Sequence, residues 1–254
     1  MNVREIEEAV RVAWPALEEE ELPVGVLRYA NGIERRTNAL SLHPDADLVP
    51  VEYIEAAEKY FRERSVAPVI RIVRSDGSSL PTLENIDNAL AHRGYEKQSP
   101  TQTMLLDLTG IVGCKTMVKA NHLAELSTWL SAWYEITGKP LEGIAVHREI
   151  LEKLELHNVR FLSLAIDGIP LSTGMAVLSE RAVGIFGIAS AASHRQQGHA
   201  SAVLASLLHW ALMRGARFAY LQVAESNQAA INLYRKLGFT RVYSHWYRVG
   251  TQIV

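Results

Sequence analysis

One order of structural elements is predicted twice along this chain of 254 residues. In the first half, hydrophobic periodicity predicts a helix over 51–64, a strand over 68–73, a second helix that ends at Gly94, and a strand that reaches Leu108. In the second half it predicts a helix over 202–214, a strand over 218–223, a second helix that ends at Gly238, and a strand over 242–249. This alternation indicates an α/β fold with a mixed sheet, and the repeated order indicates two copies of one unit.

Each second helix ends at a glycine, Gly94 or Gly238, that directly follows its apolar face and precedes an aromatic residue. A glycine there is typical of the left-handed residue that ends a helix. Both patterns stop near Gly110–Thr116, where we predict the join. We expect a first domain over 1–112 and a second over 113–254. The alternative is a single mixed α/β domain whose two ends are similar by coincidence.

The composition limits the functions that this chain can have. Its 48% hydrophobic and 21% charged residues are ordinary for a globular protein, and its net charge of −2 provides no basic surface for a nucleic acid. No apolar run reaches the roughly eighteen residues of a membrane-spanning helix. The start of the chain is acidic, unlike a signal peptide, and the lone Cys114 cannot form an internal disulfide. We expect a cytoplasmic protein that binds neither nucleic acid nor a membrane.

A short loop with one glycine connects the predicted strand over 183–190 to the next helix. Its sequence is Arg195-Gln-Gln-Gly198-His-Ala200. A helix N-terminus presents unpaired backbone N–H groups and the positive end of the helix dipole, which together bind phosphate. Gly198 lets the backbone approach an anion closely, Ala200 is small, and Arg195 adds a positive charge. The alternative is a turn glycine beside a surface arginine.

A second motif follows downstream, and it contains Asn227, Ala230, Leu233, Tyr234, Gly238 and Phe239. Taken alone, Tyr234 is a core residue on an apolar helix face and Asn227 is a helix N-cap. Together and in this order, however, the two motifs resemble the signatures of the GNAT acyltransferase superfamily, whose second motif reads Asn-x-x-Ala-x-x-x-Tyr-x-x-x-Gly-Phe. The resemblance covers roughly 120–250.

This resemblance implies a tandem of GNAT-like folds and an acetyl-CoA-dependent N-acetyltransferase, in which a primary amine attacks directly within a ternary complex. It implies that the pantetheine arm pairs with the backbone of Ile188, Ala189 and Ser190. The loop implied to hold the pyrophosphate comprises Arg195, Gln196, Gln197, Gly198, His199, Ala200 and Ser201. Asn227 would contact the CoA arm, and Tyr234 would act as the general acid.

The position of the general base departs from the family pattern. Some members carry a glutamate five residues before the asparagine, where this chain has Gln222. Glu225 is the nearest carboxylate and is our candidate. Deprotonating a lysine-like amine at pH 7 costs about 4 kcal/mol, against about 1 kcal/mol for an α-amine. Without a dedicated base, amines of low pKa are the easier substrates.

The first half lacks the residues that would bind CoA. Its corresponding loop, Leu42–Pro50, has no glycine and carries Asp45 and Asp47, and no tyrosine occupies the place of Tyr234. We expect a degenerate GNAT-like unit that completes the acceptor side. Residues 13–16 and 28–38 also resemble the leading segment of two-domain bacterial GNAT proteins. The protein would then be a monomer with an internal pseudo-dimer, or a weak homodimer.

Other charged and aromatic side chains have less specific interpretations. We interpret the Glu18–Glu21 run and the Arg35-Arg36 pair as solvated surface charge, and Trp129 and Trp133 as core. His209, His245 and Tyr247 either line the acceptor cleft or are partly exposed. His194 and His199 have no cysteine or carboxylate at ligand spacing, and we therefore expect no metal.

Two other functions compete with catalysis. A non-catalytic acyl-CoA-binding regulator stays open because Gln222 cannot accept a proton. A nucleotide-binding protein is disfavoured, since the loop is neither Gly-x-Gly-x-x-Gly nor a Walker sequence. The acceptor is expected to be a small-molecule, peptide or protein amine.

Overall fold

The computed structural model describes residues 1–46, 49–75, 81–109 and 123–251. The predicted join near Gly110–Thr116, Cys114 and Asp47 lie outside the described residues. Among the described residues, no helix has both the length and the apolar character needed to cross a membrane.

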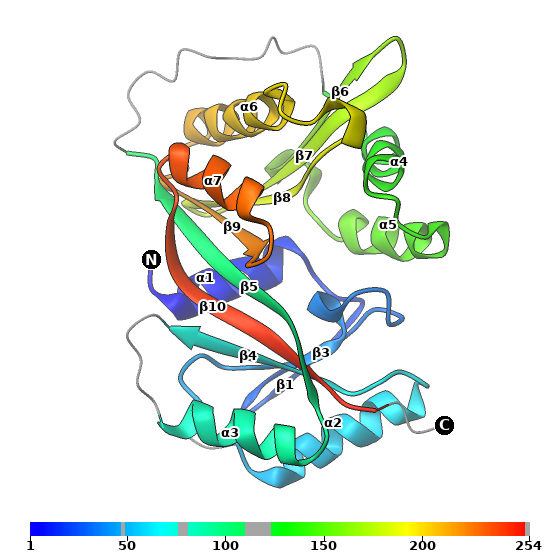
Figure 1. Cartoon of the computed structure of the whole chain (residues 1–254), viewed down its shortest axis with the longest axis vertical. Helices are drawn as coiled ribbons and strands as arrows, with labels where there is room; N and C mark the ends of the chain where they lie inside the picture. Colours follow the sequence, from blue (N-terminus) through cyan, green and yellow to red (C-terminus); the bar gives the residue numbers. More distant parts are fainter. Residues whose placement is uncertain (47–48, 76–80, 110–122, 252–254) are drawn as a thin grey trace.

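Each half of the described chain contains the predicted order of helix, strand, helix and strand (Figure 1). The α-helices are α1 (Val3–Ala13), α2 (Val51–Glu63), α3 (Pro81–His92), α4 (Leu126–Thr137), α5 (Ile144–Glu152), α6 (His199–Met213) and α7 (Gln228–Lys236). The strands are β1 (Glu18–Leu22), β2 (Gly25–Tyr29), β3 (Ala39–Leu42), β4 (Val69–Ser75), β5 (Glu96–Asp107), β6 (Val159–Ile166), β7 (Ile169–Ser179), β8 (Ala182–Ser190), β9 (Phe218–Ala224) and β10 (Thr240–Val249). Short 3-10 turns are η1 (Arg35–Thr37), η2 (Leu141–Gly143), η3 (Leu156–Asn158) and η4 (Ala192–His194).

All ten strands belong to one mixed sheet, in the order β1-β2-β3-β4-β10-β5-β9-β8-β7-β6. Its pairs are antiparallel except for β3–β4 and β8–β9, which are parallel. Each half therefore contributes one parallel pair to the sheet. This arrangement confirms the predicted mixed α/β fold.

The two halves exchange their last strands. β5 of the first half pairs with β9, and β10 of the second half pairs with β4 and also with β5 (Figure 1). The sheet is thus continuous across the middle of the molecule. The division into 1–112 and 113–254 stays a prediction about the sequence repeat, because strands from both sides of it alternate at the centre of the sheet.

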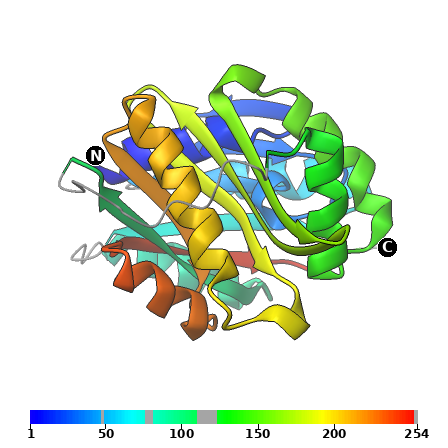
Figure 2. The same cartoon turned by 90° about the horizontal axis from the view of Figure 1, so that it is seen from above.

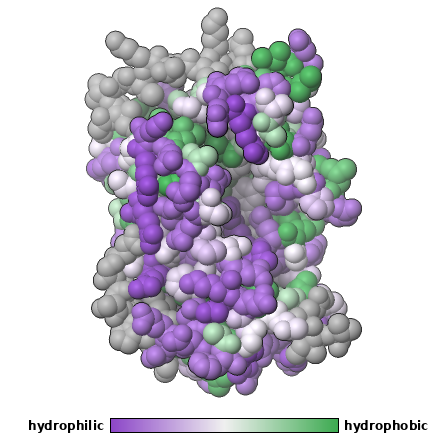
Figure 3. Space-filling view, in the orientation of Figure 1, coloured by the Kyte–Doolittle hydropathy of each residue, from purple (hydrophilic) through white to green (hydrophobic). Residues whose placement is uncertain are grey.

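Helices cover both faces of the sheet. On β9, Tyr220 packs in a core cluster with α1, α4 and α5, whereas its neighbour Leu221 packs in a cluster with α6 and α7. Since neighbouring side chains of a strand point to opposite faces, α1 and α6 lie on opposite sides of the sheet, as Figure 2 shows. Over the first half, α2 and α3 form a third cluster with Ile70 and Ile72 of β4. This region is mostly hydrophilic on the side seen in Figure 3.

Several local predictions hold in the structure. Gly94 and Gly238 have φ angles of 85° and 92°, as expected for residues that end helices. Trp129 and Trp133 are 0% and 8% exposed and stack at 5.3 Å, which confirms their place in the core. All four glutamates of the Glu18–Glu21 run are exposed, which confirms their interpretation as surface charge. Glu19 in addition pairs with the buried Arg28 at 2.9 Å.

Candidate functional site

The parallel strands β8 and β9 separate before they end. Their pairing runs from Ala182 opposite Phe218 to Ile185 opposite Leu221 and stops there. The last residues of both strands consequently have no ladder partner on this side. In open α/β sheets, ligands bind at the carboxyl ends of parallel strands, and this is the candidate site.

A bulge in β8 redirects the backbone at this point. Gly187 has a φ of +60°, and the register with β7 shifts around it. A Cβ on Gly187 would lie 2.6 Å from Cζ2 of Trp129, so both the backbone angle and the close packing require glycine here. Bulges next to active sites commonly re-aim strand groups.

The bulge leaves two of the three predicted pantetheine residues with open backbone groups. Hydroxyls of β7 donate to the carbonyls of Gly187 (3.0 Å) and Ala189 (2.7 Å). Because peptide groups alternate along a strand, those of Ile188 and Ser190 point the other way, where pairing with β9 has ended. The role of all three residues in binding pantetheine stays a prediction, and Ile188 and Ser190 are the better placed for it.

The glycine loop begins α6 with an open anion-binding geometry. Gly198 is the N-cap of α6 and has a φ of +83°. A Cβ added to Gly198 would meet no atom within 4 Å, so the space beside the loop is open. The first turn of α6 contains no acidic residue, and no side chain caps it. Arg195 forms no ion pair with any residue in the described part of the chain. The backbone N–H groups of His199, Ala200 and Ser201 are therefore available to an anion.

Replacing Gly198 with valine should weaken acetyl-CoA binding at least tenfold, or about 1.4 kcal/mol. A branched side chain is strained at φ +83° and would fill the open space where the anion lies. Calorimetric titration measures the affinity. Gly215→Val is the matched control, because Gly215 has a φ of +85° and open surroundings at the other end of α6. Equal losses in the two variants would indicate general strain and would contradict the phosphate loop.

Tyr234 is a buried residue whose hydroxyl is unengaged. It is 7% exposed, its ring lies 6.0 Å from that of Phe239, and no described residue hydrogen-bonds to its hydroxyl. Burial raises its pKa to about 12. Asn227 caps α7 by accepting the N–H of Ala230 at 3.1 Å. The expected packing and capping roles are thus confirmed, and Tyr234 stays protonated at neutral pH.

The candidate base Glu225 lies at the surface, directly after β9. Its side chain is 42% exposed and sits 3.9 Å from the Arg241 guanidinium. Gln222, by contrast, shares a face of β9 with Tyr220, and its amide approaches the Thr103 hydroxyl at 3.4 Å. Glu225 as a general base stays a prediction, and its position does not strengthen it.

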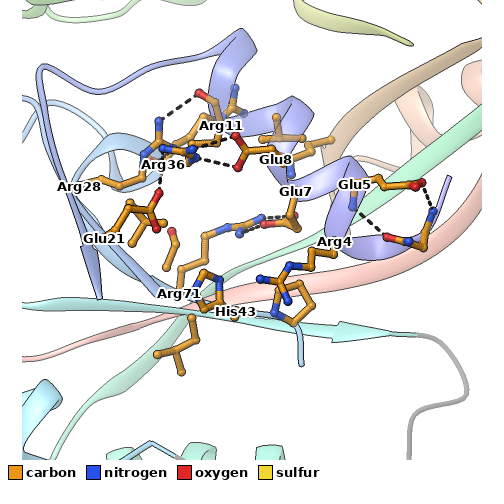
Figure 4. A pocket seen from close by; sticks show the side chains of 17 residues that line it. Arg4, Glu5, Glu7, Glu8, Arg11, Glu21, Arg28, Arg36, His43 and Arg71 are labelled. Atoms are coloured by element: carbon orange, nitrogen blue, oxygen red, sulfur yellow. Dashed lines mark hydrogen bonds and ion pairs between the residues drawn. The ribbon is translucent and has the colours of Figure 1, made fainter. Parts of the chain in front are cut away.

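A cavity of about 470 Å³, which we call the central cavity, lies on the α1 face of the sheet. Most of its lining comes from the first half, and Gln222 brings β9 to its wall. Figure 4 shows the arginines and glutamates that face one another across it. Its principal polar lining residues are Glu7, Arg28, Arg36, His43, Arg71 and Gln222. The sequence analysis did not identify this cavity, because its residues come from separate segments.

A buried ion pair closes the first-half side of this cavity. Arg71, which is 4% exposed, donates two hydrogen bonds to Glu7, and the Tyr243 hydroxyl donates a third. Burial alone would raise the pKa of Glu7, but Arg71 lowers it below its usual range. Glu7 stays ionised and is fully engaged.

The prediction for Arg36 is wrong. Its side chain is half-buried rather than solvated, and it stacks on Trp14 and Phe186 with centroid distances of 5.3 and 5.6 Å. Its neighbour Arg35 is exposed as expected and bonds to Gln98 at 2.5 Å. The two arginines are adjacent in one short turn, and no pattern in the sequence distinguishes the exposed one from the half-buried one.

Two more predictions concern histidines. His245 is 2% exposed, and burial lowers its pKa well below the usual value, so it is neutral. Tyr247 is likewise buried at 6%, so partial exposure is wrong for both, whereas His209 is partly exposed. The alternative, a place in the acceptor cleft, stays a prediction. Among the described residues, no group of three or more His, Cys, Asp or Glu is placed to hold a metal ion.

Comparisons with known proteins agree with this geometry. The family model described as "Probable histone acetyltransferase Rv0428c C-terminal" matches residues 1–249. The "Uncharacterized N-acetyltransferase YobR" of Bacillus subtilis (strain 168) is 24% identical over 257 residues, which covers 98% of both chains.

Solved structures share the fold at low sequence identity. A GCN5-related N-acetyltransferase from Kribbella flavida is 14% identical, covers 98% of this chain and 96% of its own, and has a TM-score of 0.66. A tandem GNAT protein from the clavulanic acid biosynthesis pathway is also 14% identical, covers 98% and 89%, and has a TM-score of 0.59. These likenesses support the tandem architecture.

Proposed function

The chain belongs to the acetyltransferase family described as probable histone acetyltransferase Rv0428c C-terminal, and it is a GNAT N-acetyltransferase; from this premise we propose that it transfers an acetyl group from acetyl-CoA to a primary amine within a ternary complex. The amine nitrogen bonds to the acetyl carbon as the carbon–sulfur bond breaks. The amine loses a proton to water or a base, and the CoA sulfur gains one.

One observation carries this proposal: the expected CoA-binding elements share one face of the sheet. Val203 of α6 and Tyr234 of α7 belong to one apolar cluster on the face opposite α1, and Ile188 of β8 packs against this cluster. The helix that the glycine loop begins and the helix that carries Tyr234 therefore cover the same face of the sheet as the side chain of Ile188. A long ligand with a phosphate group and an amide-containing arm fits this set of groups.

Tyr234 is suited to protonate or hydrogen-bond the departing sulfur. Its pKa of about 12 lies above that of an ordinary thiol, about 8.5, which makes full proton transfer unfavourable in water. Burial also destabilises a thiolate and so raises the pKa of its thiol. The difference between the pKa values of Tyr234 and the thiol is therefore smaller inside the site. We expect Tyr234 to assist the reaction without being indispensable.

The first half does not bind CoA in this proposal. Its parallel pair β3–β4 ends where Ser41 lies opposite Arg71, and the guanidinium of this Arg71 is bound by Glu7. Asp45 of the corresponding loop pairs with Arg4 at 2.7 Å. The first half instead supplies most of the central cavity, through which the acceptor amine approaches. The exchanged strands support a monomer.

A non-catalytic acyl-CoA-binding regulator is the second candidate, and Gln222 at the usual base position favours it. The test is incubation of the purified protein with acetyl-CoA and a panel of small-molecule, peptide and protein amines. Release of free CoA thiol and acetylated product by mass spectrometry are the readouts. We expect an amine-dependent thiol release and about one equivalent of CoA bound per chain. Tight CoA binding without product from any amine would support the regulator.

A further inference from the structure

Arg36 brings a positive charge from the first half to the side chain of Phe186 on β8. It lies in the turn after β2 and lines the central cavity. Its guanidinium carbon is 5.6 Å from the ring centroid of Phe186, which directly precedes the Gly187 bulge. The charge thus lies against a side chain of β8 that comes two residues before Ile188, the first residue with open peptide groups.

The other cavity arginines are already engaged. Arg36 itself forms no ion pair, and its guanidinium donates no hydrogen bond, to any residue within the described ranges. The engaged arginines and their partners are Arg4 with Asp45, Arg11 with Glu8, Glu19 and Glu21, Arg28 with Glu19, and Arg71 with Glu7. Five arginines line the cavity, these four and Arg36, and of the five only Arg36 is available to a ligand.

The acidic residues near Arg36 are also engaged. Among the lining acids, Glu5 belongs to the capping box of α1, and Glu7 is held by Arg71. Glu34 accepts from Trp14 Nε1 at 2.5 Å and lies 3.5 Å from His147 Nε2. Burial would raise the pKa of Glu34, but His147 and the charge of Arg36 lower it to about 2. Glu34 is therefore ionised near Arg36 without an ion pair to it.

The turn that carries Arg36 is held in place. The Asn38 side chain accepts from the N–H groups of Ala30 and Gly32 at 2.8 Å and donates to the Glu34 carbonyl at 2.7 Å. The Arg36 carbonyl accepts from Arg28 at 3.1 Å. Stacking on two aromatic rings fixes the guanidinium while its edge remains free to donate two parallel hydrogen bonds.

We infer that Arg36 binds a carboxylate of the acceptor, so that this enzyme prefers amines with a carboxylate only a few bonds from the reactive nitrogen. This inference rests on the proposed function. A guanidinium matches a carboxylate in a planar, bidentate geometry that an ammonium cannot reproduce. The carboxylate would sit in the central cavity, and the nitrogen would point across Phe186 toward β8. Arg36 is in this role a positioning residue for the acceptor.

The test compares pairs of acceptors that differ only in the carboxylate, such as an amino acid and its amide. The parent should favour the carboxylate form at least tenfold in kcat/KM. Arg36→Gln should reduce this preference to about one, mainly through KM, and leave the affinity for acetyl-CoA unchanged. Arg36→Lys should recover part of it. Arg35→Gln is the matched control, since its side chain is exposed, and it should keep the parent's preference.

Equal preference in the parent and in Arg36→Gln would overturn the inference, as would equal acetylation of the acid and the amide by the parent. Binding provides an independent measurement. With CoA present, calorimetric titration of the same acid and amide should reveal tighter binding of the acid to the parent and not to Arg36→Gln. If no amine is acetylated, the proposed function fails, while this titration still decides the role of Arg36.

Discussion

Tyr234→Phe should yield a stably folded protein whose turnover is ten- to a thousandfold lower. The substitution keeps the ring that packs near Phe239 and removes only a hydroxyl that no described residue engages, so little stability should be lost. The expected loss is that of one general acid, at or somewhat below its usual range of about a hundred- to ten-thousandfold. Steady-state kinetics under conditions where chemistry limits the rate measure it.

Two comparisons sharpen this test. The deficit should shrink with acyl donors whose thiol is more acidic, because such thiols leave without help. Tyr95→Phe is the matched control, since Tyr95 is 5% exposed, lies in the first half and hydrogen-bonds to Glu58. It should change stability and not turnover. If Tyr234→Phe is as fast as the parent, Tyr234 is only a core residue.

Residues 115–254 expressed alone should aggregate or dimerise. In the intact chain, β9 is paired with β5, and β10 is held between β4 and β5, so truncation removes every sheet partner of β10. It also uncovers the apolar face beneath α1, which includes Tyr220 and Tyr243. Exposed strand edges and apolar patches of this kind drive association.

Size-exclusion chromatography with light scattering measures the state of this fragment. Co-expression of residues 1–112 as a separate chain should restore a soluble complex, because it returns β4, β5 and α1 to their places. A monomeric, soluble and fully active fragment would establish that the halves are independent, and it would remove the first half from the acceptor side.

Local chemistry could be predicted from the sequence. Gly94 and Gly238 end helices because few other residues adopt their positive φ angles, and Trp129 and Trp133 fall on the buried face of α4. The strand, loop and helix around Gly198 could be predicted for the same reason, because the geometry of this loop depends on residues that are neighbours in the sequence. The repeated element order was sufficient to identify the mixed α/β fold.

Long-range pairing could not be predicted in this way. Nothing local to β10 specifies that Tyr243 lies opposite Ser75 on one side and Thr103 on the other. The role of Arg36 depends on Phe186, which is distant in sequence, so a pair of adjacent arginines indicated only surface charge. The central cavity was missed for the same reason.

The exchange of last strands also constrains when this protein can fold. Arg248 hydrogen-bonds to Asp87, 161 residues earlier, and Thr240 bonds to Leu105, 135 residues earlier. During synthesis, β4 and β5 leave the ribosome long before β10 is made. The strand edges that pair with β10 therefore stay unpaired until then. Proteins whose contacts join residues so distant in sequence fold slowly, and their partly folded intermediates are prone to aggregate. Completion of the chain, rather than of either half, is therefore the event that commits this enzyme to its native state.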